Sequence, residues 1–194
     1  MNVLVLGNGG REHALVWKIK QSPLVEKIFC IPGNTGTAGL AENVEIDLVD
    51  FKGIIEFAKK NKIELTVVGP EAPLVNGIVD AFIEAGLRAF GPSKRAARLE
   101  GSKIYMKKLM RKHSIPTADF IEFHDTEAAL NHIKYADVPF VIKADGLASG
   151  KGVFVCKKDE DAKKAIQEIM VEKQFGSSGN SIVIEDFMPG EEAS

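Results

Sequence analysis

The sequence predicts an α/β protein with a parallel-sheet N-terminal domain over residues 1–100 and a smaller α+β unit over residues 101–194. Two observations predict this division. Apolar runs typical of buried strands alternate with helical patterns in the first part of the chain, an order that favours a parallel sheet with helices on both faces. A mostly helical, basic segment (93–116), broken by Gly101 and stopped by Pro116, then precedes strands that flank a glycine-rich loop.

Continuous apolar runs indicate the strands of the N-terminal domain, because the strands of a parallel sheet are buried on both faces. The first run, "NVLVLG", ends at a glycine and leads into a helical pattern. Gly86 follows the last helical pattern, at a position where glycine commonly ends a helix. The expected strands are 2–7, 27–33, 63–71 and 87–93, and the expected helices are 11–22, 51–62 and 74–86.

The second unit is predicted to be α+β, with a hairpin-like pair of strands around the glycine loop. Thr126 is expected to be the N-cap of its first helix. Its second helix begins with acidic residues and ends with a lysine, the distribution that the helix dipole favours. The expected strands are 118–125, 139–146, 152–158 and 180–187, and the expected helices are 126–136 and 159–173.

Composition and charge exclude several classes of protein. The chain has 194 residues, of which 45% are hydrophobic, and a net charge of −2. This charge gives no electrostatic reason to expect nucleic acid or an anionic membrane as a partner. No apolar run approaches the ~20 residues of a membrane span. Cys30 and Cys156 lie in strand-like runs of a chain without a signal peptide, so we expect reduced core thiols and a cytoplasmic location.

The stretch "GNGGREHA" (7–14) lies between the first strand and the first helix, where α/β proteins bind anions. The dinucleotide fingerprint G-x-G-x-x-G would need glycine where Glu12 stands, and the tip of the second strand, "IPGN", lacks the carboxylate that holds a ribose. Both departures argue against NAD and FAD. Free backbone N–H groups with Arg11 and His13 suit a phosphate monoester, while a plain turn with solvated side chains is the alternative.

Two further loops follow strands and are expected to line the same crevice. They are "PGNTGTAG" (32–39) and "GPEAPLVNG" (69–77). Each is rich in glycine and proline, so each could also be a plain turn. Glu71 places a charge at the tip of the third strand.

The glycine loop "IKADGLASGKGV" (142–153) is not a Walker A motif. Three residues instead of four separate Gly146 from Gly150, and a glycine follows Lys151 where the motif needs Ser or Thr. Lys143 ends an apolar strand and must therefore project to water or to an anion.

A nucleotide site at this loop is favoured by the groups around it. Basic groups for phosphates come from Lys103, Lys143 and Lys151. Carboxylates for an adenine amine and for ribose hydroxyls come from "VIEDFMPGEE" (183–192). A flexible hairpin tip with solvated acids is the alternative interpretation.

Several long motifs together resemble one enzyme family. "LEGSK…MKKLMRKHSIPTA", "PFVIKADGLASGKGV" and "IVIEDFMPGEEAS" look like an ATP-grasp ligase. With "VLVLGNGGREHAL", "PGNTGTA" and "VVGPEAPLVNGIVD", the chain resembles the phosphoribosylamine–glycine ligase family. The resemblance implies a Rossmann-like N-terminal domain and then an incomplete ATP-grasp domain, with an α+β flap subdomain at about 117–188. It also implies that the chain is truncated, covers about the first half of the family's length and is inactive alone.

The resemblance assigns roles to individual residues. Lys103 and Lys143 should contact ATP phosphates, Glu185 the adenine amino group and Glu192 the ribose, with four loop residues forming a mobile flap. The implied ATP-binding residues are Lys103, Lys143, Ser149, Gly150, Lys151, Gly152, Glu185, Phe187 and Glu192. The implied residues for phosphoribosylamine are Gly9, Gly10, Arg11, Glu12, His13, Asn34 and Glu71.

The implied reaction joins glycine to 5-phosphoribosylamine with ATP, through a glycyl phosphate, in purine biosynthesis. Mg²⁺ is implied with ATP, and its ligands are expected in the part of the family's length that this chain does not cover. The expected partners are small molecules, with no nucleic acid and no membrane, and the expected state is a monomer or weak dimer. Alternatives are another ATP-grasp ligase or carboxylase half, and a noncatalytic nucleotide-binding fragment.

Overall fold

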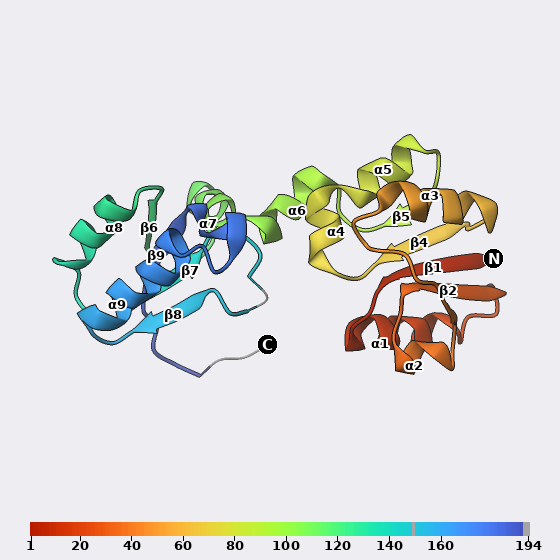
Figure 1. Cartoon of the computed structure of the whole chain (residues 1–194), viewed down its shortest axis with the longest axis horizontal. Coiled ribbons are helices and arrows are strands. Elements are labelled where there is room, and N and C mark those ends of the chain that lie inside the picture. Colours follow the sequence, from red (N-terminus) through yellow and green to blue (C-terminus); the bar gives the residue numbers. More distant parts are fainter. Residues whose placement is uncertain (149, 192–194) are drawn as a thin grey trace. The chain divides into compact units, whose positions relative to one another are not determined.

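A computed structural model describes residues 1–148 and 150–191 of the chain (Figure 1). It contains two compact units, Met1–Ala97 and Arg98–Ser194. None of the helices within the described ranges is both long enough and apolar enough to cross a membrane.

The described residues of the first unit form a five-stranded sheet in the order β3-β2-β1-β4-β5. Every strand pairing in it is parallel, which confirms the predicted parallel sheet. The strands are β1 (Asn2–Gly7), β2 (Lys27–Pro32), β3 (Glu42–Asn43), β4 (Leu65–Val68) and β5 (Ala89–Phe90). The helices are α1 (Gly10–Ile19), α2 (Thr35–Ala38), α3 (Phe51–Lys60), α4 (Glu71–Asn76) and α5 (Ile78–Glu84).

Helices cover both faces of this sheet, as the alternation along the chain predicts. Figure 1 shows α1 and α2 below the sheet and α3 and α5 above it. Along β1, Val3 and Val5 pack with Val16 of α1, whereas Leu4 and Leu6 pack into the core that contains residues of α3 and α5. The continuous apolar run of β1 therefore serves two cores, because successive side chains of a strand point to opposite faces.

Two local features of the first unit differ from the prediction. The short elements α2 and β3 are not among the expected helices and strands, because elements this short carry too few residues for a periodic pattern. The helix expected over 74–86 is in fact two helices. They are separated at Gly77, whose φ of 97° is left-handed and favours glycine.

The second unit is built around a four-stranded antiparallel sheet in the order β6-β9-β7-β8, as far as residues 98–148 and 150–191 show. The strands β7 and β8 pair as the hairpin predicted around the glycine loop. The strands are β6 (Phe120–Phe123), β7 (Phe140–Ala144), β8 (Val153–Cys156) and β9 (Ile182–Asp186). The helices are α6 (Lys94–Gly101), which begins in the first unit, α7 (Lys103–Lys112), α8 (Thr126–Ile133) and α9 (Asp159–Ile166).

The N-cap of α8 is Asp125, so the assignment of Thr126 was wrong by one residue. The Asp125 carboxylate accepts a 2.8 Å hydrogen bond from the backbone N–H of Ala128. Both residue types cap helices well, so the sequence offered two adjacent candidates. Aspartate has the added advantage of a negative charge at the positive end of the helix dipole.

The two faces of the second sheet have different surroundings. Phe140 and Ile142 of β7 and Ile184 of β9 pack with α8 and α9 in the main core of this unit. The residues that alternate with them, Lys143 and Glu185, therefore lie on the opposite face. That face carries the chemistry described next.

Candidate functional site

The strand register places an apolar strip beside an ion pair on this face. Val141 of β7 is paired with Val155 of β8 on one side and with Glu185 of β9 on the other. Lys143, two residues further along β7, is paired with Val153 of β8. Val153 and Val155 are 44% and 47% exposed. A flat apolar surface thus adjoins a lysine and a glutamate, an arrangement that suits the ring of a nucleobase.

Glu185 lies between two lysines. Its Oε2 atom is 2.7 Å from Nζ of Lys143 and 3.1 Å from Nζ of Lys107. The side chains of Glu185 and Lys107 are only 6% and 4% exposed, whereas that of Lys143 is 27% exposed. The other carboxylate oxygen, Oε1, is buried and has no hydrogen-bond partner among the described residues. Such an atom is costly to leave unpaired and is well suited to accept a bond from a ligand.

The start of α7 is held against the end of β7. Asp145 accepts hydrogen bonds from the hydroxyl of Ser102, at 3.0 Å, and from the backbone N–H of Ile104, at 2.8 Å. Lys103, between them, donates a 3.0 Å bond from Nζ to the carbonyl of Gly146. Burial lowers the pKa of the Lys103 amino group; Asp145 opposes this shift and the Lys143 ammonium adds to it.

The glycine loop is tied down at its beginning. The carbonyl of Leu147 accepts a 2.8 Å bond from the Ser178 hydroxyl, and a side chain at Gly146 would collide with Ser178. Lys151 and Gly150 are exposed, and the φ of Gly150 is 75°. Position 146 therefore favours glycine because a side chain would collide with Ser178, and position 150 favours glycine because its φ is positive.

Of the four remaining predicted ATP residues, the structure describes two, Gly152 and Phe187. Gly152 is buried at the start of the hairpin's second strand, and its carbonyl accepts a bond from Ala144. Phe187 follows β9 and is 39% exposed. Ser149 and Glu192, which were also predicted to bind ATP, lie outside the described residues.

In the first unit, the predicted phosphate loop forms the N-terminus of α1. Gly9 is the N-cap, and its backbone N–H donates a 2.7 Å bond to the carboxylate of Glu12. Glu12 is 4% exposed, and a side chain at Gly7 or Gly69 would collide with it. Glu12, the residue that departs from the dinucleotide fingerprint, therefore fills the space between the ends of β1 and β4. A Cβ at Gly10, by contrast, would meet only open space.

Side chains link the three loops at the carboxyl ends of the parallel strands. Asn34, after β2, donates from Nδ2 to the carbonyls of Asn8 and Gly9 at 2.9 and 3.1 Å. Arg11 donates 3.1 Å bonds to the carbonyl of Gly69 and to the carboxylate of Glu71. The pKa of the Glu71 carboxyl group is lowered. The largest cause is a hydrogen bond from the backbone N–H of Glu71 itself, and the next is the hydrogen bond from Arg11.

The predicted residues of the first unit therefore do lie together at one edge of the sheet. His13 is exposed on α1, and its ring lies so close to Gly36 of α2 that a side chain there would collide with it. A cavity of about 460 Å³ opens at the same edge, where β1 and β2 end. It is lined by Asn8, Pro32, Glu45, Ile46, Asp47 and Leu48. The sequence had not singled out residues 45–48.

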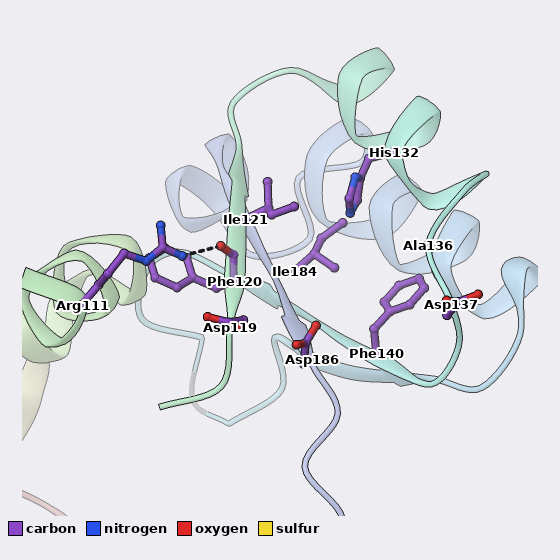
Figure 2. Close-up of a pocket in the computed structure, with 10 residues that line it drawn as sticks. All are labelled: Arg111, Asp119, Phe120, Ile121, His132, Ala136, Asp137, Phe140, Ile184 and Asp186. Carbon is purple, nitrogen blue, oxygen red and sulfur yellow. Dashed lines mark hydrogen bonds between the residues drawn. The ribbon is translucent and has the colours of Figure 1, made fainter. Parts of the chain in front are cut away.

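A second cavity, of about 440 Å³, lies at the β6–β9 side of the second unit (Figure 2). In Figure 2 Asp119 and Asp186 lie near each other, and Arg111 donates a 2.8 Å bond to the carbonyl of Phe120. None of the predicted ATP residues that the structure describes lines this cavity. Its wall residue Ile184 precedes Glu185 on β9 and faces the opposite side of the sheet.

Sequence reasoning missed two residues of the nucleotide-side cluster, Lys107 and Asp145. Lys107 follows Lys103 by four residues and so lies on the same helix face. Its helical neighbours include the charged residues Lys103 and Arg111, so the pattern of α7 does not mark Lys107 as buried. Asp145 had no local signal either, because its partners are more than forty residues away. Among the described residues, no group of three or more His, Cys, Asp and Glu side chains could hold a metal ion.

The fold and this cluster define the first part of an ATP-grasp enzyme: a parallel-sheet domain, then an antiparallel sheet with paired lysines and a glycine loop. The family models agree with that class. Residues 1–100 match the model described as phosphoribosylglycinamide synthetase, N domain, and residues 101–194 match that of its ATP-grasp (A) domain. The chain therefore belongs to the phosphoribosylglycinamide synthetase family.

Curated relatives extend the comparison. The chain is 52% identical to the phosphoribosylamine–glycine ligase of Haemophilus influenzae and 53% identical to that of Escherichia coli K12. Both comparisons cover 100% of this chain but 46% of the relative. The chain thus spans about half the length of the curated relatives it matches.

Solved structures give the same fold. The phosphoribosylamine–glycine ligase of Thermotoga maritima superposes with a TM-score of 0.78 at 32% identity, covering 98% of this chain and 45% of that one. The biotin carboxylase domain of a Hydrogenobacter thermophilus 2-oxoglutarate carboxylase, solved with MgADP, ADP and bicarbonate, gives 0.77 at 18% identity. It covers 96% of this chain and 44% of that one, and at this identity it supports the fold alone.

Proposed function

We propose that this chain supplies the phosphoribosylamine site and part of the ATP site of a ligase that joins glycine to 5-phosphoribosylamine. Membership of the phosphoribosylglycinamide synthetase family supports this reaction. The single structural observation that carries the ATP assignment is Glu185. Its buried Oε1 atom has no hydrogen-bond partner within residues 1–148 and 150–191, and it lies on the same sheet face as Lys143 and the exposed valines of β8.

The proposed nucleotide site matches the chemistry of ATP. The adenine ring would lie on Val153 and Val155, and its amino group would donate to Glu185. Lys143 and Lys103 would turn toward the phosphates, with Lys151 closing over them from the loop. Charge-assisted bonds of this kind are stronger than neutral ones, and they neutralise the oxygens of a phosphoryl group during transfer.

The reaction needs an activated carboxylate. The glycine carboxylate attacks the γ-phosphoryl group of ATP, which gives glycyl phosphate and ADP. The amine of phosphoribosylamine then attacks the acyl carbon, and phosphate leaves. The lysines stabilise the transferring phosphoryl group, and a loop that closes over the site would keep water from the acyl phosphate. A flap subdomain over about residues 117–188 remains part of this proposal.

The first unit would bind the phosphate of phosphoribosylamine. The start of α1 presents backbone N–H groups and the positive end of the helix dipole. Gly10 leaves open space above that end, and Arg11 is exposed beside it. Gly9, Glu12, His13, Asn34 and Glu71 complete the proposed site, with Glu12 and Asn34 holding the loop in shape.

The proposal also covers the metal cofactor, the oligomeric state and the cellular location of the enzyme. Mg²⁺ would accompany ATP and neutralise charge on its phosphates. The described residues hold no cluster of three or more His, Cys, Asp and Glu side chains that fits the ion. We further propose a cytoplasmic enzyme that is a monomer or weak dimer and whose partners are small molecules.

The test is turnover by a ligase of the relatives' full length that carries this chain as its N-terminal part. ADP release should depend on both glycine and phosphoribosylamine. Bicarbonate in place of glycine should give none, which separates this function from that of a carboxylase. ADP release that follows bicarbonate and ignores glycine would contradict the proposal. ATP binding without turnover under any of these conditions would favour a noncatalytic nucleotide-binding protein.

A further inference from the structure

The two lysines that contact Glu185 are not equivalent. Lys107 is almost fully buried, and three oxygens lie within reach of its ammonium group. They are Oγ1 of Thr117 at 2.7 Å, the carbonyl of Ala118 at 3.2 Å and Oε2 of Glu185 at 3.1 Å. An ammonium group has three N–H donors, so this set uses all of them.

The ammonium group of Lys143 uses fewer of its N–H donors. Within residues 1–148 and 150–191, its one acceptor is Oε2 of Glu185, at 2.7 Å. Its side chain is about a quarter exposed and lies on the face that carries Val153 and Val155. Lys143 can therefore turn toward a ligand, whereas Lys107 is held by its three oxygens.

We infer that Lys107 is a positioning residue, the permanent counter-ion that keeps the Glu185 carboxylate in place when Lys143 turns to the phosphates of ATP. This inference rests on the proposed function of the same site. A buried carboxylate that lost its only cation would be strongly destabilised. Lys107 prevents this loss, because Glu185 keeps the Lys107 ammonium group as a counter-ion when Lys143 turns away. Two more charged groups belong to the same cluster as Glu185 and Lys143. They are Lys103 at the start of α7 and Asp145 after β7.

The experiment replaces Lys107 with methionine in the full-length ligase, which removes the charge and keeps the shape of the chain. The KM and calorimetric Kd for ATP should rise about tenfold to a hundredfold, the effect of losing a charge-assisted contact. The KM values for glycine and phosphoribosylamine should change little. Lys108→Met is the matched control, since Lys108 pairs with Glu122 on the surface, and its ATP affinity should equal that of the wild type.

A double-variant cycle separates positioning from a merely structural role. If Lys107 acts through Glu185, Lys107→Met with Glu185→Gln should bind ATP no more weakly than Glu185→Gln alone. This pair also serves if Lys107→Met does not fold, because it leaves no buried unpaired charge. A further tenfold loss in the pair, or unchanged ATP affinity in a folded Lys107→Met variant, would overturn the inference.

Failure of the proposed function is distinguishable from failure of this inference. A wild type that binds ATP without glycine-dependent turnover contradicts the function, and calorimetry still tests Lys107. A wild type that turns over normally, with Lys107→Met unaffected in ATP binding, contradicts the inference alone. A wild type that does not bind ATP contradicts both.

Discussion

The carboxylate of Asp145 accepts a 2.8 Å hydrogen bond from the backbone N–H of Ile104, so the residue that follows β7 caps the helix that carries Lys103 and Lys107. The same carboxylate accepts from Ser102, the N-cap of α7. The glycine loop and the lysine helix are therefore joined at one point.

Asp145→Ala should both destabilise the protein and weaken ATP binding. The loss of a helix cap costs about 1 kcal/mol, and up to about 2. Thermal unfolding of the second unit measures this cost. Asp125→Ala removes the cap of α8 in the same way and is the control. It should lower stability similarly but leave ATP affinity unchanged. Equal ATP affinities in the two variants would show that the α7 cap does not support the nucleotide site.

Lys143→Ala should weaken ATP binding in the full-length ligase. A lost charge-assisted bond is worth about 1.5–3 kcal/mol, or roughly tenfold to a hundredfold in affinity. Leu147→Ala in the neighbouring loop keeps the carbonyl that Ser178 contacts, so it should have a smaller effect. Isothermal titration with ATP compares them. A Lys143→Ala variant with wild-type affinity would remove the phosphate assignment.

Gly10→Val should raise the KM for phosphoribosylamine and leave the KM for ATP unchanged. A side chain here meets open space within the chain, so the fold should tolerate it while the backbone N–H groups are shielded from a ligand. Ala14→Val, one turn further along α1 and also exposed, is the control for helix propensity. Steady-state kinetics with each substrate varied in turn is the measurement. A selective rise in the KM for ATP would assign this loop to the nucleotide instead.

ATP affinity should fall with rising pH before the ordinary lysine pKa of ~10.4 is reached. Burial lowers the pKa of Lys103, and only its protonated form attracts phosphate. Affinity is therefore present below this lowered pKa and is lost as pH rises through it. Lys103→Arg keeps its charge over the whole range, so its affinity should decline less. Parallel affinity curves for the wild type and Lys103→Arg would show that Lys103 does not cause the decline.

Both cysteines should be inert toward thiol reagents in the folded protein. Cys30 and Cys156 are free and buried, as the sequence predicted, and burial raises the pKa of each to about 11. The thiolate is the reactive form, and little of it exists at neutral pH. Titration with a coloured disulfide reagent should detect no thiol before denaturant is added and two afterwards. Rapid reaction of either thiol without denaturant would contradict the burial.

Short-range patterns determined much of the fold. The apolar run of β1, the helical spacing of α3 and the paired strands around the glycine loop each depend on neighbours in sequence, so they were predictable. The small elements α2 and β3 were not, since four and two residues cannot show a period. The N-cap of α8 was misplaced by one residue because Asp125 and Thr126 are both suitable caps.

The sequence by itself also determined which residues are candidates for the site. Lys143 is a candidate because it is a charged residue at the end of an apolar strand. Gly10 is a candidate because it is a glycine at the start of the helix that follows an apolar strand. That these residues bind ATP and phosphoribosylamine stays a prediction. Only the tertiary structure decided which side chains contact the candidate residues. Lys107 and Glu185 are 78 positions apart along the chain, and their ion pair exists because α7 packs against β9. No local pattern records such a contact, because it depends on how distant elements pack.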